Sequence, residues 1–487
     1  MLNKTRTRVA LIWPDGLDIR RVLPLPFACL AANTDPLLCE FKLFDLALGL
    51  PPGKDLAGEI AAFCPDVIGV SCFAMNFPQA LAAVRIAKRA APSAIVVAGG
   101  QYASAWPEGA LSHPEIDFVI KGEGERAFTA FIKELRSAGP RWASVPGLAR
   151  LENGRLVDAP PAMVEELDSL ALPDYKFIKF DEYLRRGYRV YADHRPSAPV
   201  QTTRGCPYGC AFCTGPSISG RRLRHFSTPY VMRWLKLLHK DFGIRWFNII
   251  DDNFTFHPEK AKEFCRAAMN LAIPGLRFGT PNGIRLQHGD KELWQLMRSA
   301  GWEHFTVAPE SGSARVLDLM KKELRPAEVE AVVKEMKAAG LPVCGFFMVG
   351  YPGETPEDIR LTMRFIRQFE LVEMFVFQPL PGSPVFRELL AAGKISADFI
   401  PAVEDFSSGK RSYVSAELGG VNLYRVMLAA RLGTALRHPV YALKHLRHLD
   451  FGAAARKLVR QAADFIRFTA ISYSARIRKR SAPNAEK

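Results

Sequence analysis

The sequence predicts an α/β protein that begins with a doubly wound, Rossmann-like domain and continues as a partial (β/α)6 barrel. Two observations predict this class. Short apolar runs alternate with helical patterns over residues 7–145, and the same alternation returns over residues 196–390. A chain of 487 residues also exceeds what one hydrophobic core normally holds. We therefore expect domains at 1–145 and 196–390, a linker with a small hairpin at 146–195, and a basic helical region at 391–487.

The first domain contains four apolar runs that are typical of buried parallel strands: RVALIW (8–13), DVIGVSCF (66–73), AIVVAGG (94–100) and DFVIKGEGE (117–125). Ligands of such sheets bind at the carboxyl ends of the strands. Here those ends carry small or polar residues, namely Ser71, Gly99, Gly100, Gln101, Gly122, Glu123 and Gly124. They predict a site for a cofactor rich in phosphate or amide groups, with simple tight turns as the alternative.

Six further strands are expected in the second domain, near VQTTRG, FNIIDDNF, RFGTPNG, HFTVAPES, VCGFFMVG and MFVFQPL. Helical patterns separate them, which favours parallel βα units. Six such units form a barrel that is open on one side and places its chemistry in the loops at one mouth. After Pro381 the pattern becomes mainly helical.

Composition and charge indicate where the protein is located and which partners it is expected to bind. The chain has 48% hydrophobic and 24% charged residues, no apolar run of membrane-spanning length and no signal-peptide pattern, so we expect a cytoplasmic protein with reduced thiols. The net charge is +15, yet residues 431–480 hold twelve bases against two acids and so supply +10 of it. Because the excess is local, the charge does not require nucleic-acid binding, and we expect none.

The most informative motif is a loop with three cysteines, Cys206, Cys210 and Cys213, in the stretch TTRGCPYGCAFC. A loop lets three sulfurs converge on one centre, whereas a strand would alternate them between two faces. Structural zinc sites normally need four ligands, and no partner pair with zinc-finger spacing follows. Three thiolates fit a 4Fe–4S cluster with one iron left open, because closed clusters use four cysteines.

A C-x3-C-x2-C loop with an aromatic residue, Phe212, before its last cysteine, at the first strand of a βα barrel, resembles the radical S-adenosylmethionine superfamily. The resemblance implies that the open iron chelates S-adenosylmethionine and that one electron cleaves the cofactor to a 5′-deoxyadenosyl radical. A low-potential electron donor of the flavodoxin or ferredoxin type is then expected as a partner. An incidental cysteine-rich loop or a zinc site is the alternative.

Later motifs have the order and spacing that this superfamily shows. The resemblance implies that S-adenosylmethionine is bound by Phe212 and by residues after the second, third, fourth and fifth barrel strands: Asp252, Arg285, Glu310, Ser311 and Gly350. A cation such as Arg285 suits the cofactor carboxylate. The alternative for the acids is that they cap the helices that follow them.

A doubly wound domain joined to such a barrel resembles the cobalamin-binding subfamily. The resemblance implies that the corrinoid lies across the strand ends, near the residues from Ser71 to Gly124 named above. Many such domains carry a D-x-H-x-x-G motif whose histidine binds cobalt, but here Leu17 stands at the corresponding position and the first histidine is His113. We therefore expect cobalamin in a His-off state, and a degenerate domain without corrinoid is the alternative.

The basic carboxyl-terminal segment combines helical periodicity with many bases. One interpretation is peripheral contact with anionic lipid at the inner membrane surface, which would make a hydrophobic substrate more plausible. The other is a helix that packs on the barrel and keeps its bases in water.

The leading hypothesis for function is radical C-methylation of an unactivated carbon, with the methyl group delivered through cobalamin. A second hypothesis keeps the cofactors but ends in cyclisation or oxidation. A third is a non-enzymatic corrinoid or cluster sensor, against which the ordered barrel motifs argue. The sequence does not identify the organic substrate or the residues that contact it in catalysis.

Overall fold

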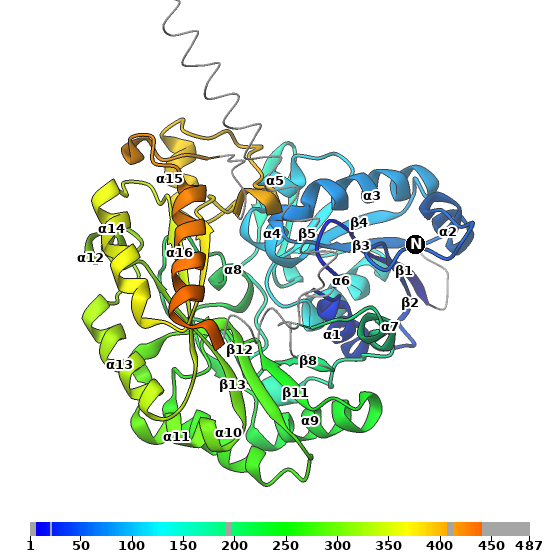
Figure 1. Ribbon diagram of the computed structural model, residues 1–487. Helices are drawn as coiled ribbons and strands as arrows, with labels where there is room; N and C mark the ends of the chain where they lie inside the picture. The colour runs from blue at the N-terminus through cyan, green and yellow to red at the C-terminus, as the bar shows by residue number, and fades with distance from the viewer. Residues whose placement is uncertain (1–5, 20–21, 190–195, 407–412, 441–487) are drawn as a thin grey trace, which may run out of the picture.

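The computed structural model describes residues 6–19, 22–189, 196–406 and 413–440. Two α/β parts lie side by side, the amino-terminal part in blue and cyan and the barrel in green and yellow (Figure 1). The order of elements and the two largely parallel sheets confirm the predicted fold class.

The first sheet has seven strands in the order β2-β1-β3-β4-β5-β6-β7. Its parallel strands are β1 (Thr7–Trp13), β2 (Cys39–Asp45), β3 (Val67–Ser71), β4 (Ile95–Gly99) and β5 (Phe118–Ile120). The apolar pattern predicts four of these and misses β2. Glu40 and Lys42 interrupt its apolar residues, which an edge strand tolerates because it is only partly covered.

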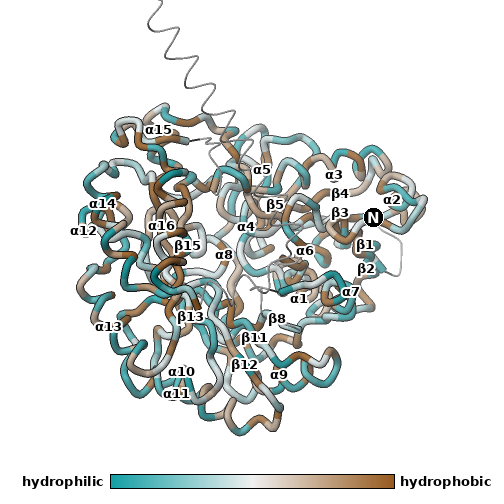
Figure 2. The backbone as a smooth tube through the Cα atoms, viewed as in Figure 1, coloured by the Kyte–Doolittle hydropathy of each residue, from teal (hydrophilic) through white to brown (hydrophobic). Residues whose placement is uncertain are grey.

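Helices cover both faces of this sheet, as parallel strands require. On one face lie α2 (Leu56–Phe63), α3 (Phe77–Ala90), α4 (Gly100–Ala105) and α5 (Pro107–Leu111), and on the other lie α1 (Leu25–Asn33) and α6 (Gly124–Arg136). The side chains of β1 alternate between the two cores, Leu11 toward α1 and Ile12 toward α3. Figure 2 shows the apolar stretches along β3 and β4 in the middle of this part.

The hairpin expected after the first domain is present as β6 (Leu148–Glu152) and β7 (Arg155–Asp158). It does not stand alone, because β6 pairs antiparallel with β5 and extends the first sheet. The boundary that the sequence suggested at residue 145 therefore falls inside this sheet. Helix α7 (Phe180–Arg185) follows before the barrel begins.

The second sheet is parallel throughout, in the order β15-β14-β13-β12-β11-β8. Its strands are β8 (Ser197–Val200), β11 (Trp246–Ile249), β12 (Arg277–Ile284), β13 (Trp302–Glu310), β14 (Val343–Val349) and β15 (Leu371–Val376). The intervening helices include α9 (Thr228–Phe242), α10 (Pro258–Met269), α11 (Lys291–Ser299), α12 (Ala314–Leu319), α13 (Pro326–Ala338) and α14 (Pro356–Phe365). Because β8 and β15 do not pair with each other, the barrel is partial, as predicted.

Two helices beyond the barrel are described, α15 (Pro384–Ala391) and α16 (Leu423–Arg437). The turn before α15 abuts the first domain, since a Cβ on Gly382 would lie 2.0 Å from the carbonyl oxygen of Ala105. Trp106 and Phe386 continue this contact with ring centroids 5.1 Å apart. Most of the predicted basic tail, from residue 441, lies outside the described residues. Within the described part of the chain, no helix is both long and apolar enough to cross a bilayer.

Candidate functional site

The three cysteines lie in an irregular loop directly after the short strand β9 (Thr203–Arg204). The loop can turn there because Gly205 has a φ of +102°, and a Cβ on it would lie 2.3 Å from the Arg222 carbonyl oxygen. The backbone N–H of Cys206 donates to Gly220 at 3.1 Å, and that of Cys213 donates to Cys210 at 3.1 Å. The sequence between the cysteines therefore closes a compact loop.

This cysteine loop is fixed to two later parts of the chain. The N–H of Ala211 donates to the carbonyl of Met320 after α12, at 2.9 Å. The carbonyl of Ala211 accepts from Val385 in α15, also at 2.9 Å. Its geometry thus depends on the fourth barrel unit and on the segment beyond the barrel.

The three cysteines of the loop carry free thiols, and burial shifts the pKa of two of them. All three are free, and burial raises the pKa of Cys206 and Cys213, in the latter case to about 12, with Cys210 contributing in both. In the ranges that the structure describes, no group of three or more His, Cys, Asp or Glu side chains is arranged around one metal ion. Metal binding would displace the thiol protons.

Two aspartates after β11 connect to this loop in different ways. Asp251 is buried and accepts from the N–H of Thr202 at 2.7 Å and from its hydroxyl at 2.5 Å. Burial raises its pKa to about 6. Asp252, a predicted cofactor ligand, accepts from Ser219 and from the Gly205 N–H, and it interacts electrostatically with Cys213. Asp251 therefore anchors the strand before the loop, while Asp252 faces the loop.

Glu310 ends β13 in a left-handed conformation, with a φ of +68°. Its carboxylate lies 3.0 Å from the Nζ of Lys322, and both side chains are about nine-tenths buried. The ammonium group is also 5.7 Å from the ring centroid of Phe212 and interacts with Cys210. Sequence reasoning missed Lys322, because no motif marks it and only the fold places it beside the loop.

Arg285 and Ser311 make contacts within the protein. The guanidinium of Arg285 lies 3.3 Å from the ring centroid of Tyr208 in the cysteine loop, and it donates to the carbonyls of Lys322 and Glu323. The Ser311 hydroxyl pairs with Thr362 of α14 at 3.1 Å. Both residues lie at the same mouth of the barrel, and their contact with a cofactor stays a prediction.

Gly350 follows β14 with a φ of +88°, and a Cβ there would lie 2.7 Å from the Leu423 side chain at the start of α16. Its N–H donates to the buried carboxylate of Glu354, whose pKa burial raises to about 7. The turn at Gly350, a predicted S-adenosylmethionine contact, is therefore held by its own loop and covered by α16.

A cavity of about 520 Å³ lies where the two parts of the molecule meet. Six of the seven predicted cobalamin contacts line it: Ser71, Gly99, Gly100, Gly122, Glu123 and Gly124. The seventh, Gln101, instead donates to Thr214, the residue after Cys213, at 3.0 Å. The strand ends thus converge on one cavity, and Gln101 joins α4 to the cysteine loop.

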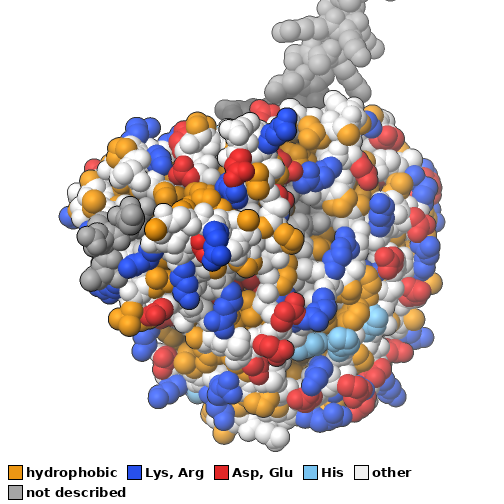
Figure 3. All heavy atoms as spheres, turned by 180° about the vertical axis from the view of Figure 1, so that it is seen from behind, with side chains coloured by type: hydrophobic (Ala, Val, Ile, Leu, Met, Phe, Trp, Pro, Cys, Tyr) orange, Lys and Arg blue, Asp and Glu red, His pale blue; other side chains and the backbone are white. Residues whose placement is uncertain are grey.

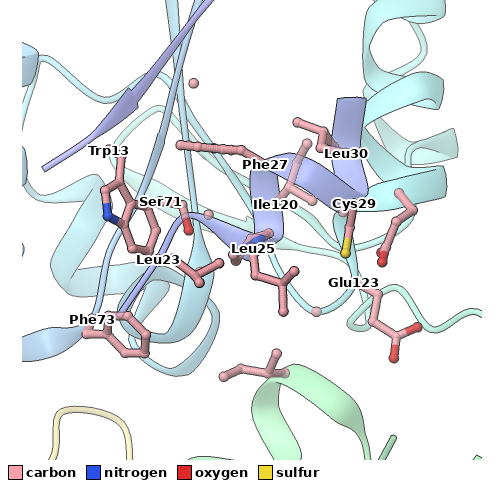
Figure 4. A pocket seen from close by; sticks show the side chains of 18 of the residues that line it. Trp13, Leu23, Leu25, Phe27, Cys29, Leu30, Ser71, Phe73, Ile120 and Glu123 are labelled. Atoms are coloured by element: carbon pink, nitrogen blue, oxygen red, sulfur yellow. The ribbon is translucent and has the colours of Figure 1, made fainter. Parts of the chain in front are cut away.

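The walls of this cavity differ in chemistry. Apolar side chains from β1, α1 and the loops beside them face it on one side, among them Trp13, Leu23, Leu25, Phe27 and Phe73 (Figure 4). Barrel residues face it on the other side: Pro199, Gln201, Arg204, Ile218, Ser219, Ile250, Pro281 and Asn282. Gly100 has a φ of +84°, and a Cβ on it would lie 2.6 Å from the Ser71 hydroxyl oxygen. The glycine therefore lets the start of α4 pack closely against the loop after β3 at the edge of the cavity.

Two buried arginines tie the cavity floor to the cysteine loop. Arg224 in β10 (Arg224–His225) binds both carboxylate oxygens of Glu123, at 2.9 and 2.6 Å. Arg204, two residues before Cys206, lies 2.8 Å from Glu125. Glu123 therefore lines the cavity while its charge is neutralised by the barrel.

Known proteins share both halves of this architecture. Residues 38–132 match the B12 binding domain model, and residues 200–366 match the radical SAM superfamily model. An uncharacterized methyltransferase of Pyrococcus horikoshii is 29% identical over 342 residues, covering 69% of this chain and 72% of the relative. The cytidylyl-2-hydroxyethylphosphonate methyltransferase of Streptomyces wedmorensis is 28% identical over 377 residues, covering 71% and 70%.

A cyclase relative and a solved structure complete the comparison. The anaerobic magnesium-protoporphyrin IX monomethyl ester cyclase of Cereibacter sphaeroides is 26% identical over 359 residues, covering 72% of this chain and 57% of the relative. The fold matches that of the radical S-adenosylmethionine methyltransferase TsrM from Kitasatospora setae with a TM-score of 0.66 at 20% identity, over 79% of this chain and 78% of that one. Taken with the cysteine loop and the cavity, these matches show that the chain belongs to the cobalamin-binding radical S-adenosylmethionine enzyme family.

Proposed function

We propose that the protein transfers a methyl group to an unactivated carbon, using a 4Fe–4S cluster on Cys206, Cys210 and Cys213, S-adenosylmethionine and cobalamin. One observation carries the proposal: the 520 Å³ cavity is bounded on one side by the glycine-rich strand ends and on the other by residues attached to the cysteine loop. Arg204 precedes Cys206, and Ser219 donates to Asp252, which faces Cys213. The proposed corrinoid and cluster sites would therefore border one space.

The chain's own residues hold and orient the reactants. When bound, the cluster and S-adenosylmethionine supply a radical that abstracts hydrogen, and the corrinoid supplies the methyl group. Lys322 and Glu310 place a neutralised ion pair beside Phe212, where charge on a bound amino acid moiety needs compensation. The apolar wall formed by Trp13, Leu23 and Phe27 excludes water from one side of the cavity.

We also propose that cobalamin binds without a protein imidazole on cobalt. No histidine lines the cavity within the described chain, and the side chains around it on β1 and α1 are apolar. The loop after β1 carries Leu17 where related domains have histidine. A low-potential electron donor and an organic substrate with apolar character complete the proposed partners.

Cyclisation or oxidation with the same cofactors is a second candidate, supported by the similarity to an anaerobic cyclase. The two candidates differ in product mass. With S-adenosylmethionine labelled as CD3 and an extract of small metabolites as substrate source, methylation predicts a product that has gained a labelled methyl group. A product that has lost hydrogen or gained oxygen, without label, would contradict the proposal.

Replacing any of Cys206, Cys210 or Cys213 with alanine should abolish both the visible absorbance of the anaerobically reconstituted cluster and the release of 5′-deoxyadenosine under strong reductant. Each thiolate is needed, because three are the minimum that the open cluster requires. Cys64→Ser is the matched control, since Cys64 is exposed and far along the sequence from the loop. Retention of the full cluster signal in Cys213→Ala would argue against the assignment.

Gly100→Ala should weaken cobalamin retention about tenfold or more while sparing the cluster absorbance. The added methyl would meet Ser71 at 2.6 Å in a left-handed backbone, a strain of about 1–3 kcal/mol at the cavity edge. Gly53→Ala is the control, because Gly53 also has a positive φ of +75° but has nothing within 4 Å of the new carbon. Equal retention by the two variants, measured by gel filtration with hydroxocobalamin, would count against this cavity.

The absence of an imidazole ligand predicts a spectroscopic signature that does not depend on turnover. Protein loaded with cobalamin and reduced to the cobalt(II) state should give an electron paramagnetic resonance spectrum without nitrogen superhyperfine splitting from a histidine, so 15N-labelling of the protein's histidines should leave the spectrum unchanged. Nitrogen splitting that changes on this labelling would show an axial imidazole and overturn the His-off assignment.

A further inference from the structure

The helix α16 has one side in the core and an opposite side that is apolar but exposed. Its buried residues Leu423, Met427, Ala430 and Thr434 recur at helical spacing, and the helix packs along β15. On the solvent side, leucines recur every four residues, and an exposed valine follows the helix: Leu428 (43% exposed), Leu432 (55%), Leu436 (82%) and Val440 (76%). Single exposed leucines are common on protein surfaces, but a continuous row indicates a contact surface.

Basic side chains predominate around this leucine row, although α14 also carries Glu357 and Asp358 in its first turn. Helix α16 contains three arginines, Arg425, Arg431 and Arg437, and no acid. Beside it, α14 and the 3-10 turn η5 (Ile366–Gln368) supply three more: Arg360, Arg364 and Arg367. Of these, Arg360 pairs with Glu357 at 2.6 Å, whereas Arg364 and Arg367 have no ion pair among the residues that the structure describes. On the opposite side of the molecule, basic and acidic side chains are mixed (Figure 3).

A groove of about 350 Å³ runs between α14, η5 and α16. Arg360, Arg364 and Arg367 line one side and Arg437 the other, with Met363 and Ile366 among the apolar residues of its lining. No carboxylate lines it within the described chain. Guanidinium groups that converge without an acid attract anions, and arginine is well suited to phosphate oxygens.

The charge of this surface and its leucine row together indicate what kind of partner binds it. A second copy of this face would bring two sets of arginines together. The segment that follows, residues 441–480, has ten bases against two acids and would also be repelled. An anionic bilayer satisfies both features, because it offers phosphates for the arginines and an apolar boundary for the leucines. Arginine side chains can keep their charged ends at the headgroups while the helix lies at this boundary.

We propose that the face formed by α14, η5 and α16, which we call the arginine–leucine face, docks on an anionic phospholipid bilayer. The row from Leu428 to Leu436 contacts the acyl boundary, and the groove at Arg364, Arg367 and Arg437 receives lipid phosphates. This surface is separate from the cysteine loop and from the cavity between the two parts of the molecule. The inference therefore does not depend on the cofactors of the proposed function.

Vesicle sedimentation with the full chain tests this inference. The protein should pellet with vesicles that contain phosphatidylglycerol and phosphatidylcholine, should not pellet with phosphatidylcholine alone, and should be released by high salt. The double variants Leu432→Glu/Leu436→Glu and Arg364→Glu/Arg367→Glu should each lower the bound fraction at limiting lipid about tenfold or more. Inorganic phosphate, compared with chloride at equal ionic strength, should not compete.

Two variants in the first domain serve as controls. Leu37→Glu replaces a leucine that is 78% exposed and so matches the leucine substitutions. Arg89→Glu reverses an exposed charge on α3 and so matches the arginine substitutions. Both should bind vesicles like the parent. The absorbance of the reconstituted cluster and the circular dichroism spectrum should be unchanged in every variant, which excludes misfolding. Parental vesicle binding by both double variants would overturn the proposal, since lipid contact would then lie elsewhere, and so would equal binding to neutral vesicles. A change in oligomeric state in place of vesicle binding would assign the face to a second copy.

Discussion

The ion pairs between Glu123 and Arg224 and between Glu125 and Arg204 are the contacts on which the proposed chemistry depends most. They lie across the junction of the two sheets, and all four side chains are more than nine-tenths buried. Removing one member of such a pair typically costs about 3–5 kcal/mol, because the remaining charge stays buried without compensation. The pairs therefore fix the distance between the cavity floor and the loop that carries Cys206.

Through these two ion pairs, residues at a strand end of the first domain can influence the position of the cysteine loop in the barrel. Glu123 belongs to the loop after β5, while Arg204 lies directly before the cysteine loop. Gln101 adds a second connection, through its bond to Thr214 on the far side of Cys213. The cysteine loop is thus held from both of its ends by the amino-terminal domain, which couples any movement between the domains to the position of the thiols.

The sequence predicts much of this arrangement, because parallel strands bring their carboxyl ends to one edge. Cys206, Asp252 and Glu310 are distant along the chain, yet they lie at or beyond the carboxyl ends of β8, β11 and β13, which belong to one parallel sheet. The alternation of strands and helices therefore suffices to place them at one mouth of the barrel. The same rule predicts that Ser71, Gly100 and Gly122 lie near one another, and all three line one cavity. The spacing of Cys206, Cys210 and Cys213 can be recognised in the sequence itself, whereas the contacts that fix the loop come from later segments.

What the sequence could not predict depends on contacts between distant segments. Nothing local marks Arg224 as the partner of Glu123, or the hairpin at β6 as an extension of the first sheet. Gln101 was grouped with the cavity residues because it follows a strand, but the first turn of α4 directs it toward the barrel. Each of these facts requires the relative placement of the two domains, which periodicity does not encode.

The backbone beside the cysteine loop is under unusual strain, and Lys322 shows why it persists. Three non-glycine residues with positive φ gather there: Glu310, Lys321 and Glu323. Such conformations cost roughly 1–3 kcal/mol each and survive only where the surroundings determine them. Arg285 supplies that constraint by donating to the carbonyls of Lys322 and Glu323 while it stacks on Tyr208. These contacts keep the Lys322 ammonium 3.0 Å from the Glu310 carboxylate and close to Phe212, so that the ion pair is preorganised beside the cysteine loop.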